Sequence, residues 1–117
     1  MLYERDICAK LYLFGSCLFR DDFNDIDVLF IYDNSQVVAE YAYELFEPLI
    51  KKSQGAFNCR LHFLLLSDEE EKELGYTNLK SVSFVSKINL SDDIGEIIRA
   101  FINKKFPGRL SKSQYNL

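Results

Sequence analysis

Apolar residues are grouped along the chain in blocks that predict both strands and helices. Three short apolar runs, at residues 10–14, 25–32 and 59–66, are bounded by turn residues and have the length of buried strands. Residues 76–90 give conflicting signals, because their apolar positions fit helical spacing while their serines and β-branched residues are typical of a strand. We predict a strand within this segment.

A helix is predicted after the polar residues 33–35, which offer capping side chains. Pro48 lacks the backbone N–H that a helix interior needs, so this helix is expected to end or kink near it. Its apolar and aromatic residues are expected to pack in the core rather than to stack on a base. They are Val37, Val38, Tyr41, Ala42, Tyr43, Leu45 and Phe46.

Two further helices have recognisable ends. Ser67 and Glu70 have the spacing of a capping box, in which each side chain bonds the backbone amide of the other residue, and the helix should end near Gly75. The last helix is expected to be capped by Ser91. Its apolar stripe consists of Ile94, Ile97, Ile98, Phe101 and Ile102.

The composition is that of an ordinary globular domain. The chain has 117 residues, 48% of them hydrophobic, which is enough for a core without disulfides or a structural metal. Together with the predicted strands and helices, this indicates a single α/β domain over residues 1–117. The polar tail at residues 109–117 is expected to be flexible.

Charge and cysteine usage narrow the partners and the compartment. The chain has 14 lysines and arginines against 18 acidic residues, a net charge of −4, so it lacks the broad basic field that free nucleic acid needs. Cys8, Cys17 and Cys59 have no metal-ligand spacing and are expected to be reduced core residues. No apolar run approaches the ~20 residues of a membrane helix, and the start of the chain lacks a secretory leader, so we expect a cytoplasmic protein without a membrane partner.

The residues that carry chemistry gather in one stretch. Gly15-Ser16 ends the first predicted strand, and after eight residues Asp25 and Asp27 open the second. Residues i and i+2 of a strand share a face, about 6.6 Å apart, so the two carboxylates lie side by side and repel each other. Magnesium commonly binds one or two protein carboxylates, with water and substrate phosphate completing its shell. The pair therefore predicts a magnesium site.

The Gly15-Ser16 turn suits a phosphate group. Gly15 can adopt backbone conformations closed to other residues and lets a phosphate approach the main chain. Ser16 adds a hydroxyl, and a helical turn starting there would offer free N–H groups to an anion. Either motif alone is more often structural, but their order between two apolar strands indicates a nucleoside triphosphate site.

Gly15-Ser16 followed by Asp25-x-Asp27, with Asn24 before the acids, resembles the signature of the DNA polymerase beta-like nucleotidyltransferases, in particular the minimal nucleotidyltransferases. The resemblance implies a small mixed β-sheet with helices mainly on one face. It also implies a magnesium enzyme that transfers a nucleoside monophosphate from a triphosphate, with ATP as the expected donor, to an acceptor hydroxyl. It assigns Asp25 and Asp27 to magnesium, and Gly15 and Ser16 to the β- and γ-phosphates.

Two other residues are weaker candidates for the same site. The family carries a third acidic residue on its third strand, and His62 falls at that position here. His62 could act as a neutral general base or a nitrogen ligand, because the ordinary pKa of histidine lies near neutrality; it could equally be a structural residue of the sheet. Arg20 is a candidate contact for the triphosphate, and fits a solvated surface residue at least as well.

The resemblance leaves a second class of function open. A lone domain of this size has little surface left for an acceptor, and single domains of this family often work with a separate helical partner of HEPN type, some of them as antitoxins. A catalytically degenerate domain would then be an interaction module. Exposed edge strands are also compatible with a homodimer. If the two motifs coincide by chance, the aspartates should point away from the Gly-Ser turn.

Overall fold

The computed structural model describes residues 7–79 and 81–110 of the chain. Its elements in chain order are β1 (Cys8–Phe14), the 3₁₀ turn η2 (Gly15–Leu18), β2 (Asp25–Tyr32), α1 (Ala39–Gln54), β3 (Arg60–Ser67), α2 (Asp68–Leu74), the 3₁₀ turn η3 (Tyr76–Asn78), β4 (Val82–Asn89) and α3 (Ile94–Lys105). The strands form a sheet in the order β3-β2-β1-β4, in which β2 and β3 are parallel and β1 is antiparallel to both its neighbours. The predicted α/β class with a mixed sheet is confirmed.

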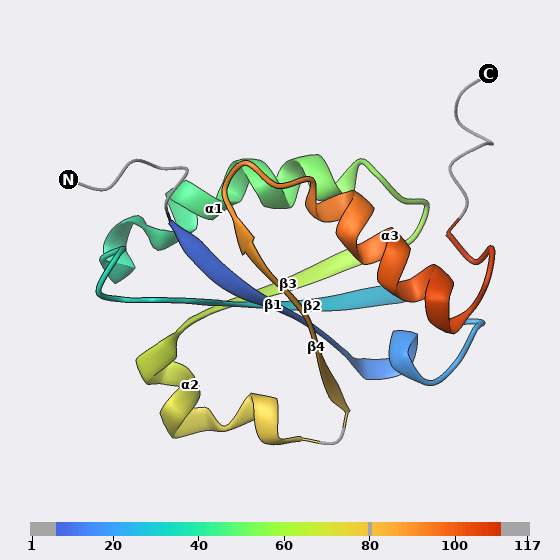
Figure 1. The fold of residues 1–117 in the computed structure, drawn as a ribbon, viewed down its shortest axis with the longest axis horizontal. Coiled ribbons are helices and arrows are strands. Elements are labelled where there is room, and N and C mark those ends of the chain that lie inside the picture. The colour runs from blue at the N-terminus through green and yellow to red at the C-terminus, as the bar shows by residue number, and fades with distance from the viewer. Residues whose placement is uncertain (1–6, 80, 111–117) are drawn as a thin grey trace.

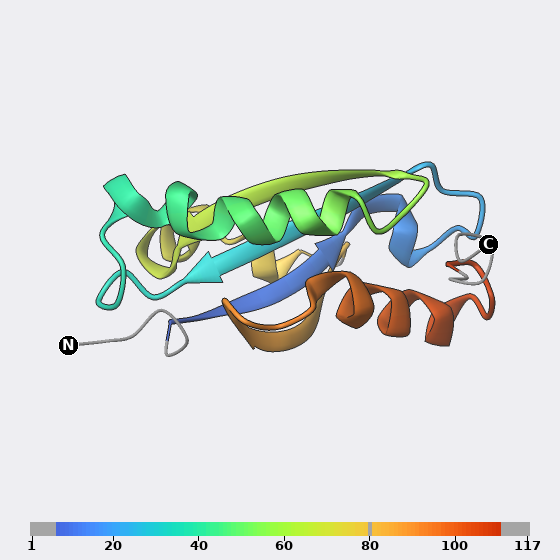
Figure 2. The same ribbon diagram turned by 90° about the horizontal axis from the view of Figure 1, so that it is seen from above.

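The two long helices lie on the same side of the sheet. In Figure 1, α1 and α3 lie above the strands, whereas α2 and η3 lie below them. Figure 2, seen from above, shows α1 running along the β2 and β3 side and α3 along the β1 and β4 side. We call the side under α1 and α3 the covered face and the opposite side the open face.

Alternation along β2 decides which side chains reach each face. On this strand, the side chains of Ile26, Val28 and Phe30 are fully buried in the core beneath the long helices. Asp25, Asp27 and Leu29 alternate with them and therefore point to the open face. Leu29 joins a smaller apolar cluster there, which is separate from the main core. The candidate acids thus belong to the face that the long helices leave uncovered.

An aromatic stack holds α1 against the sheet. The ring of Phe30 on β2 stacks on Phe63 of β3, with centroids 5.5 Å apart, and on Phe46 of α1, with centroids 5.8 Å apart. Phe30 and Phe46 are both fully buried. Aromatic pairs of this kind add to the stabilisation from buried area alone.

The start of α1 differs from the prediction. The helix begins at Ala39, and Val38 stands at its N-cap without a side-chain hydrogen bond. Residues 33–35 form a turn of their own, in which the Asp33 carboxylate accepts hydrogen bonds from the Ser35 amide, at 2.8 Å, and from its hydroxyl. The Asp33 side chain therefore caps this turn, six residues before the helix begins.

Pro48 does not end α1, which continues to Gln54. The residues directly after the proline, Leu49 and Ile50, are buried against the core. Burial of an apolar face supplies most of the stability of a protein helix, so it offsets the hydrogen bond that proline removes.

Three of the residues expected in the core on α1 are at the surface. Val38, Tyr41 and Tyr43 are 54%, 57% and 59% exposed, whereas Ala42 and Phe46 are buried as expected. Tyr41 and Tyr43 flank Ala42 at about 100° on either side of it, which turns both rings away from the core, and Val38 precedes the first turn of the helix. The expectation of core packing was wrong for these three residues.

The remaining elements agree more closely with the sequence. Strand β4 lies within residues 76–90, after η3. The capping box is confirmed, because the Glu70 amide donates to the Ser67 hydroxyl at 3.0 Å and the Ser67 amide donates to the Glu70 carboxylate at 2.9 Å. Helix α2 ends at Leu74, before Gly75, as predicted.

The cap of α3 is not the predicted one. Asp93 stands at the N-cap and accepts a hydrogen bond from the Glu96 amide at 3.1 Å. The Ser91 hydroxyl instead donates to the Asn89 side chain at 2.6 Å. Both residues have capping chemistry, and the course of the chain after β4 decides which one stands at the start of the helix.

Two residues of the predicted tail are tied to the domain. The Leu110 side chain is buried, and its amide donates to the Asn103 side chain at 2.7 Å. Arg109 donates to the Asp21 carbonyl at 2.7 Å. Residues 111–117 lie outside the described part of the chain. None of the helices in the described part has both the length and the apolar character needed to cross a membrane.

Replacement of Phe46 tests the aromatic stack. The variant Phe46→Ala should lose roughly 3 to 5 kcal/mol of unfolding free energy in urea denaturation, because it leaves a cavity beneath α1. Tyr43→Ala, on the exposed side of the same helix, should stay within about 0.5 kcal/mol of the unmodified protein. Equal losses in the two variants would contradict the assignment of the faces.

Candidate functional site

The two aspartates open β2 on the open face, as their spacing predicts. Asp27 is paired with Phe14, the last residue of β1, in the antiparallel register. This pairing brings the turn that follows β1 beside the start of β2. Antiparallel pairing therefore makes neighbours of two motifs that are separated by eight residues in the sequence.

Gly15 lies directly against the carboxylate of Asp27. A Cβ atom at Gly15 would lie 2.5 Å from Asp27 Oδ2, and the φ angle of Gly15 is +82°, a region that side-chain-bearing residues rarely adopt. Asp27 thus points toward the turn and not away from it, which is the arrangement that the chance-coincidence interpretation does not expect.

The helical turn that was expected at the Gly-Ser motif is present as η2, which begins at Gly15. The Gly15 amide donates to the Ser81 carbonyl at 3.1 Å, so it is not a free donor for an anion. The Ser16 side chain is exposed, and the backbone carbonyl of this residue accepts hydrogen bonds from the amides of Phe19 and Arg20. The Ser16 hydroxyl is therefore accessible to a ligand, while the glycine contributes space rather than a hydrogen bond.

The electrostatics of Asp27 are unfavourable. Burial raises the pKa of the Asp27 carboxyl, the nearby imidazole of His62 lowers it, and the negative charge of Asp25 raises it. Among the described residues, no hydrogen bond or ion pair satisfies this carboxylate. A cation between the two aspartates would relieve both the burial cost and the repulsion.

His62 lies beside the acid pair. Parallel pairing of β2 with β3 sets His62 opposite Asp27 and Arg60 opposite Asp25. The imidazole Nε2 atom lies 3.7 Å from Asp25 Oδ1, and the side chain of His62 is about half exposed. Arg60 Nε also lies 3.7 Å from Asp25 Oδ1. These separations are within ion-pair range and too long for hydrogen bonds.

Arg60 was not among the residues that the sequence singled out. Its signal is positional, since it precedes His62 by two residues and therefore shares its face of β3. Parallel pairing with β2, which the sequence of β3 alone does not reveal, brings it to Asp25. The acid pair thus has a cationic guanidinium on one side and an imidazole close by.

Arg20 makes its contacts within the connection between the two motifs. Its guanidinium binds both carboxylate oxygens of Asp22 at 2.9 Å, and both side chains are largely exposed. An exposed ion pair of this kind contributes little stability. The contact with Asp22 therefore does not prevent Arg20 from binding a phosphate.

Arg109 fastens the same connection from the far end of the chain. Its guanidinium lies 4.2 Å above the ring of Phe23 and donates to the backbone carbonyls of Asp21 and Phe23. Cation–π and hydrogen-bond contacts together fix the segment that leads into Asp25. No local pattern in the sequence indicates this role, because the partners are more than 80 residues apart.

The donor set fits magnesium bound together with a phosphate ligand. Within the described residues, no three histidine, cysteine or acidic side chains converge into a group that could hold a metal ion by itself. Asp25 and Asp27 supply hard carboxylate oxygens on one face. Magnesium uses such a small protein contribution where substrate phosphates and water complete its octahedral shell.

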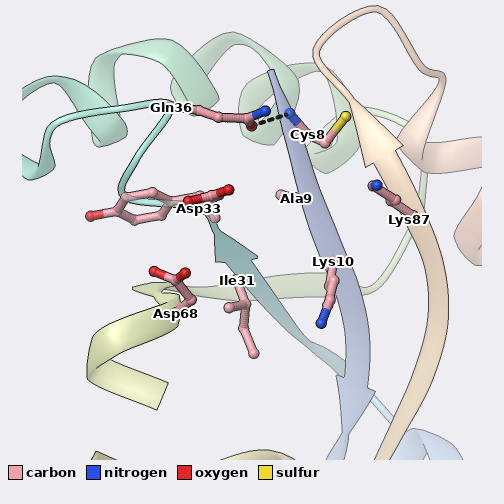
Figure 3. Close-up of a pocket in the computed structure, with 9 residues that line it drawn as sticks. Cys8, Ala9, Lys10, Ile31, Asp33, Gln36, Asp68 and Lys87 are labelled. Atoms are coloured by element: carbon pink, nitrogen blue, oxygen red, sulfur yellow. Dashed lines mark hydrogen bonds between the residues drawn. The ribbon is translucent and has the colours of Figure 1, made fainter. Parts of the chain in front are cut away.

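A separate cavity lies at the other end of the open face. Figure 3 shows Lys10 and Lys87, which are cross-strand partners, on one side of this cavity and Asp33 and Asp68 on the other. Its volume is about 240 Å³. Both acids are already engaged, Asp33 by the Ser35 amide and hydroxyl and Asp68 by backbone amides. No residue predicted for the nucleotide site lines it.

Comparisons with known proteins do not identify the chain. No protein-family model matches it, and neither a curated protein nor a solved structure does. The resemblance to nucleotidyltransferases therefore stays a prediction, and the geometry around Gly15 and Asp27 is the main support for a function.

Replacement of Gly15 tests its contact with Asp27. Gly15→Ala should lose at least about 1 kcal/mol more unfolding free energy than Gly108→Ala, because both glycines have positive φ angles while nothing lies within 4 Å of a Cβ at Gly108. Urea denaturation measures both variants. Adding Asp27→Ala to the Gly15→Ala variant should recover this excess, and equal losses at the two glycines would rule out the close contact.

The pH dependence of stability tests the environment of Asp27. Folding raises the pKa of this group, so the folded state binds its proton more tightly and stability falls as pH rises through that pKa. Asp27→Asn should therefore unfold with a larger free energy than the unmodified protein at neutral pH, and the gain should vanish below the ordinary pKa of aspartate. Denaturant titrations at several pH values measure the difference.

Asp22 provides a control of opposite sign. The guanidinium of Arg20 lowers the pKa of Asp22, so this group contributes stability above its ordinary pKa that is lost on acidification. Asp22→Asn should leave the protein no more stable at neutral pH than before. A gain in Asp22→Asn equal to that in Asp27→Asn would show a general effect of net charge instead.

Proposed function

We propose that this protein is a magnesium-dependent nucleotidyltransferase that transfers a nucleoside monophosphate from a nucleoside triphosphate, with ATP as the expected donor, to an acceptor hydroxyl. The observation that carries the proposal is the contact between the half-buried carboxylate of Asp27 and the backbone of Gly15, which has no side chain. A hydrogen-bonded structural aspartate would have protein donors around it, whereas Asp27 has the surroundings of a ligand for a cation.

Each residue of the site has a role in the proposal. Asp25 and Asp27 would hold magnesium, which would supply positive charge to the phosphate oxygens and to the departing pyrophosphate. Gly15 leaves room for the Asp27 carboxylate, beside which the phosphates would lie, and the exposed Ser16 hydroxyl would donate to the β- or γ-phosphate. Arg60 helps to orient Asp25, because its guanidinium lies within ion-pair range of that carboxylate.

The proposed reaction is an in-line displacement at the α-phosphorus. The acceptor oxygen forms a bond to the α-phosphorus, the bond from that phosphorus to the bridging oxygen breaks, and pyrophosphate leaves with the electron pair. The hydroxyl proton passes to a neutral imidazole nitrogen of His62, which is half exposed and therefore accessible to an acceptor. His62 thus takes a base role in place of a third carboxylate.

Arg20 enters the proposal as a phosphate contact. It lies in the connection between the two motifs, and the triphosphate would have to compete with Asp22 for its guanidinium. Exposed ion pairs contribute little stability, so a highly charged ligand easily offsets the loss of the pair with Asp22.

The proposal also places the protein in the cytoplasm, where ATP and magnesium are abundant. Burial raises the pKa of Cys17 to about 11, so its thiol stays protonated there.

A second function is favoured by the surface of α1. Tyr41 and Tyr43 on α1, and Val38 at its N-cap, expose large apolar side chains. In this alternative the nucleotide site is degenerate, and the domain is an antitoxin-like interaction module for a helical partner of HEPN type or for a second copy of the chain. The absence of a third acid at His62 is compatible with this alternative.

Calorimetric titration with ATP separates the two functions. The unmodified protein should bind ATP saturably in the presence of magnesium, and Asp25→Ala should abolish this binding. At 100 times its dissociation constant, the bound nucleotide should add about 2.7 kcal/mol to the unfolding free energy, which thermal denaturation detects. Asp21→Ala removes one negative charge from the neighbouring loop and should bind as the unmodified protein does.

Two results would contradict the enzyme proposal. Absence of binding to any common triphosphate would favour the interaction module. Equal binding with magnesium and with a chelator would show that the aspartates do not hold a metal for the nucleotide. Where binding is found, transfer is measured as release of pyrophosphate in the presence of candidate hydroxyl acceptors, and His62→Ala should slow it more than it weakens ATP binding.

A further inference from the structure

Two aromatic rings lie on the open face next to the candidate phosphate site. The rings of Tyr12 on β1 and Phe84 on β4 meet edge to face, with centroids 5.3 Å apart and an angle of 69° between their planes. Phe84 is 52% exposed although it lies in a strand. We call these two residues the aromatic pair.

The strand register places the aromatic pair on the same face as the acids. Asp27 is paired with Phe14, and two residues further along β2, Leu29 is paired with Tyr12. Tyr12 is in turn paired with Phe84 across the other edge of β1. Directly paired residues of antiparallel strands share a face, so Asp27, Tyr12 and Phe84 all project from the open face.

The turn at Gly15 is physically joined to the strand that carries Phe84. The Gly15 amide donates to the carbonyl of Ser81, and β4 begins at the next residue, Val82. The phosphate site and the aromatic pair are therefore parts of one surface, held together by a backbone hydrogen bond.

We propose that the aromatic pair is the base-binding subsite, on which the aromatic base of the nucleoside triphosphate stacks while its phosphates lie at Gly15 and the acids. This inference rests on the proposed function and extends it to the part of the ligand that the phosphate site does not recognise. Aromatic side chains bind bases through their faces, and every base has a π-face to offer.

The separation of the two parts suits a nucleotide. With strands about 4.8 Å apart and same-face residues about 6.7 Å apart along a strand, Phe84 lies about 12 Å from Asp27 measured between backbones. A ribose and its phosphates bridge such a distance. The side of the open face near α2 is less suitable, because Leu29 and Leu66 are buried there against neighbouring side chains.

Tyr12 adds a polar group to the subsite. Burial raises the pKa of its phenol, and the negative charge of Glu71 raises it further, so the hydroxyl stays protonated at neutral pH. A protonated phenol both donates and accepts hydrogen bonds. The exposed ring of Phe84 then supplies stacking, and its edge-to-face contact with Tyr12 holds it in place.

Parallel titrations with ATP and with inorganic tripolyphosphate, both with magnesium, test the subsite. Phe84→Leu should weaken ATP binding about tenfold, which corresponds to about 1.4 kcal/mol, and should leave tripolyphosphate binding unchanged. Phe84→Tyr keeps an aromatic face and should bind ATP as the unmodified protein does. Tyr43→Leu, an equally exposed aromatic residue on α1, is the matched control and should change neither affinity.

The two ligands distinguish failure of the subsite from failure of the site as a whole. If the unmodified protein binds tripolyphosphate and ATP equally, or if Phe84→Leu keeps full affinity for ATP, the phosphate site stands and the base-binding subsite is refuted. If neither ligand binds, the proposed function fails and the subsite fails with it. A Phe84→Leu variant that loses tripolyphosphate binding as well would show structural damage, and the normal affinity expected of Phe84→Tyr would then decide whether an aromatic face is needed.

Discussion

The contact between Gly15 and the Asp27 carboxylate is the constraint on which the candidate site depends. It requires β1 and β2 to pair in one register, because a shift by one residue would turn Asp27 into the core and Val28 to the open face. The buried side chains of β2 exclude that shift, since they fill the core beneath α1 and α3. Core packing on one face thus fixes the position of a carboxylate on the other.

The two faces of the sheet divide stability from chemistry. On the covered face, the stack around Phe30 and the long helices bury a continuous apolar core. On the open face, charged groups of both signs stand close together at one end, where Asp27 is partly buried without a protein donor among the described residues. Such an arrangement costs stability, and the well-packed opposite face allows the domain to retain it.

Long-range contacts hold the connection that carries the acids into position. Arg109, which follows α3 in the chain, donates to the backbone carbonyls of Asp21 and Phe23. The carbonyl of Ser81, just before β4, accepts a hydrogen bond from the Gly15 amide. The Gly-Ser turn and the approach to Asp25 are therefore each fastened by residues from the second half of the chain. These fastenings favour a site that is formed before any ligand arrives, which lowers the ordering cost of binding.

The sequence by itself determined the features that depend on near neighbours. The apolar run of β2, the alternation that sets Asp25 and Asp27 on one face and the capping box at Ser67 were all predicted, because they follow from strand periodicity and from hydrogen bonds that span three residues. Tertiary structure alone decided the rest. It exposed Tyr41, and it brought Arg60 and Phe84 to the open face through pairing with other strands, since burial and register depend on partners that are distant in the chain.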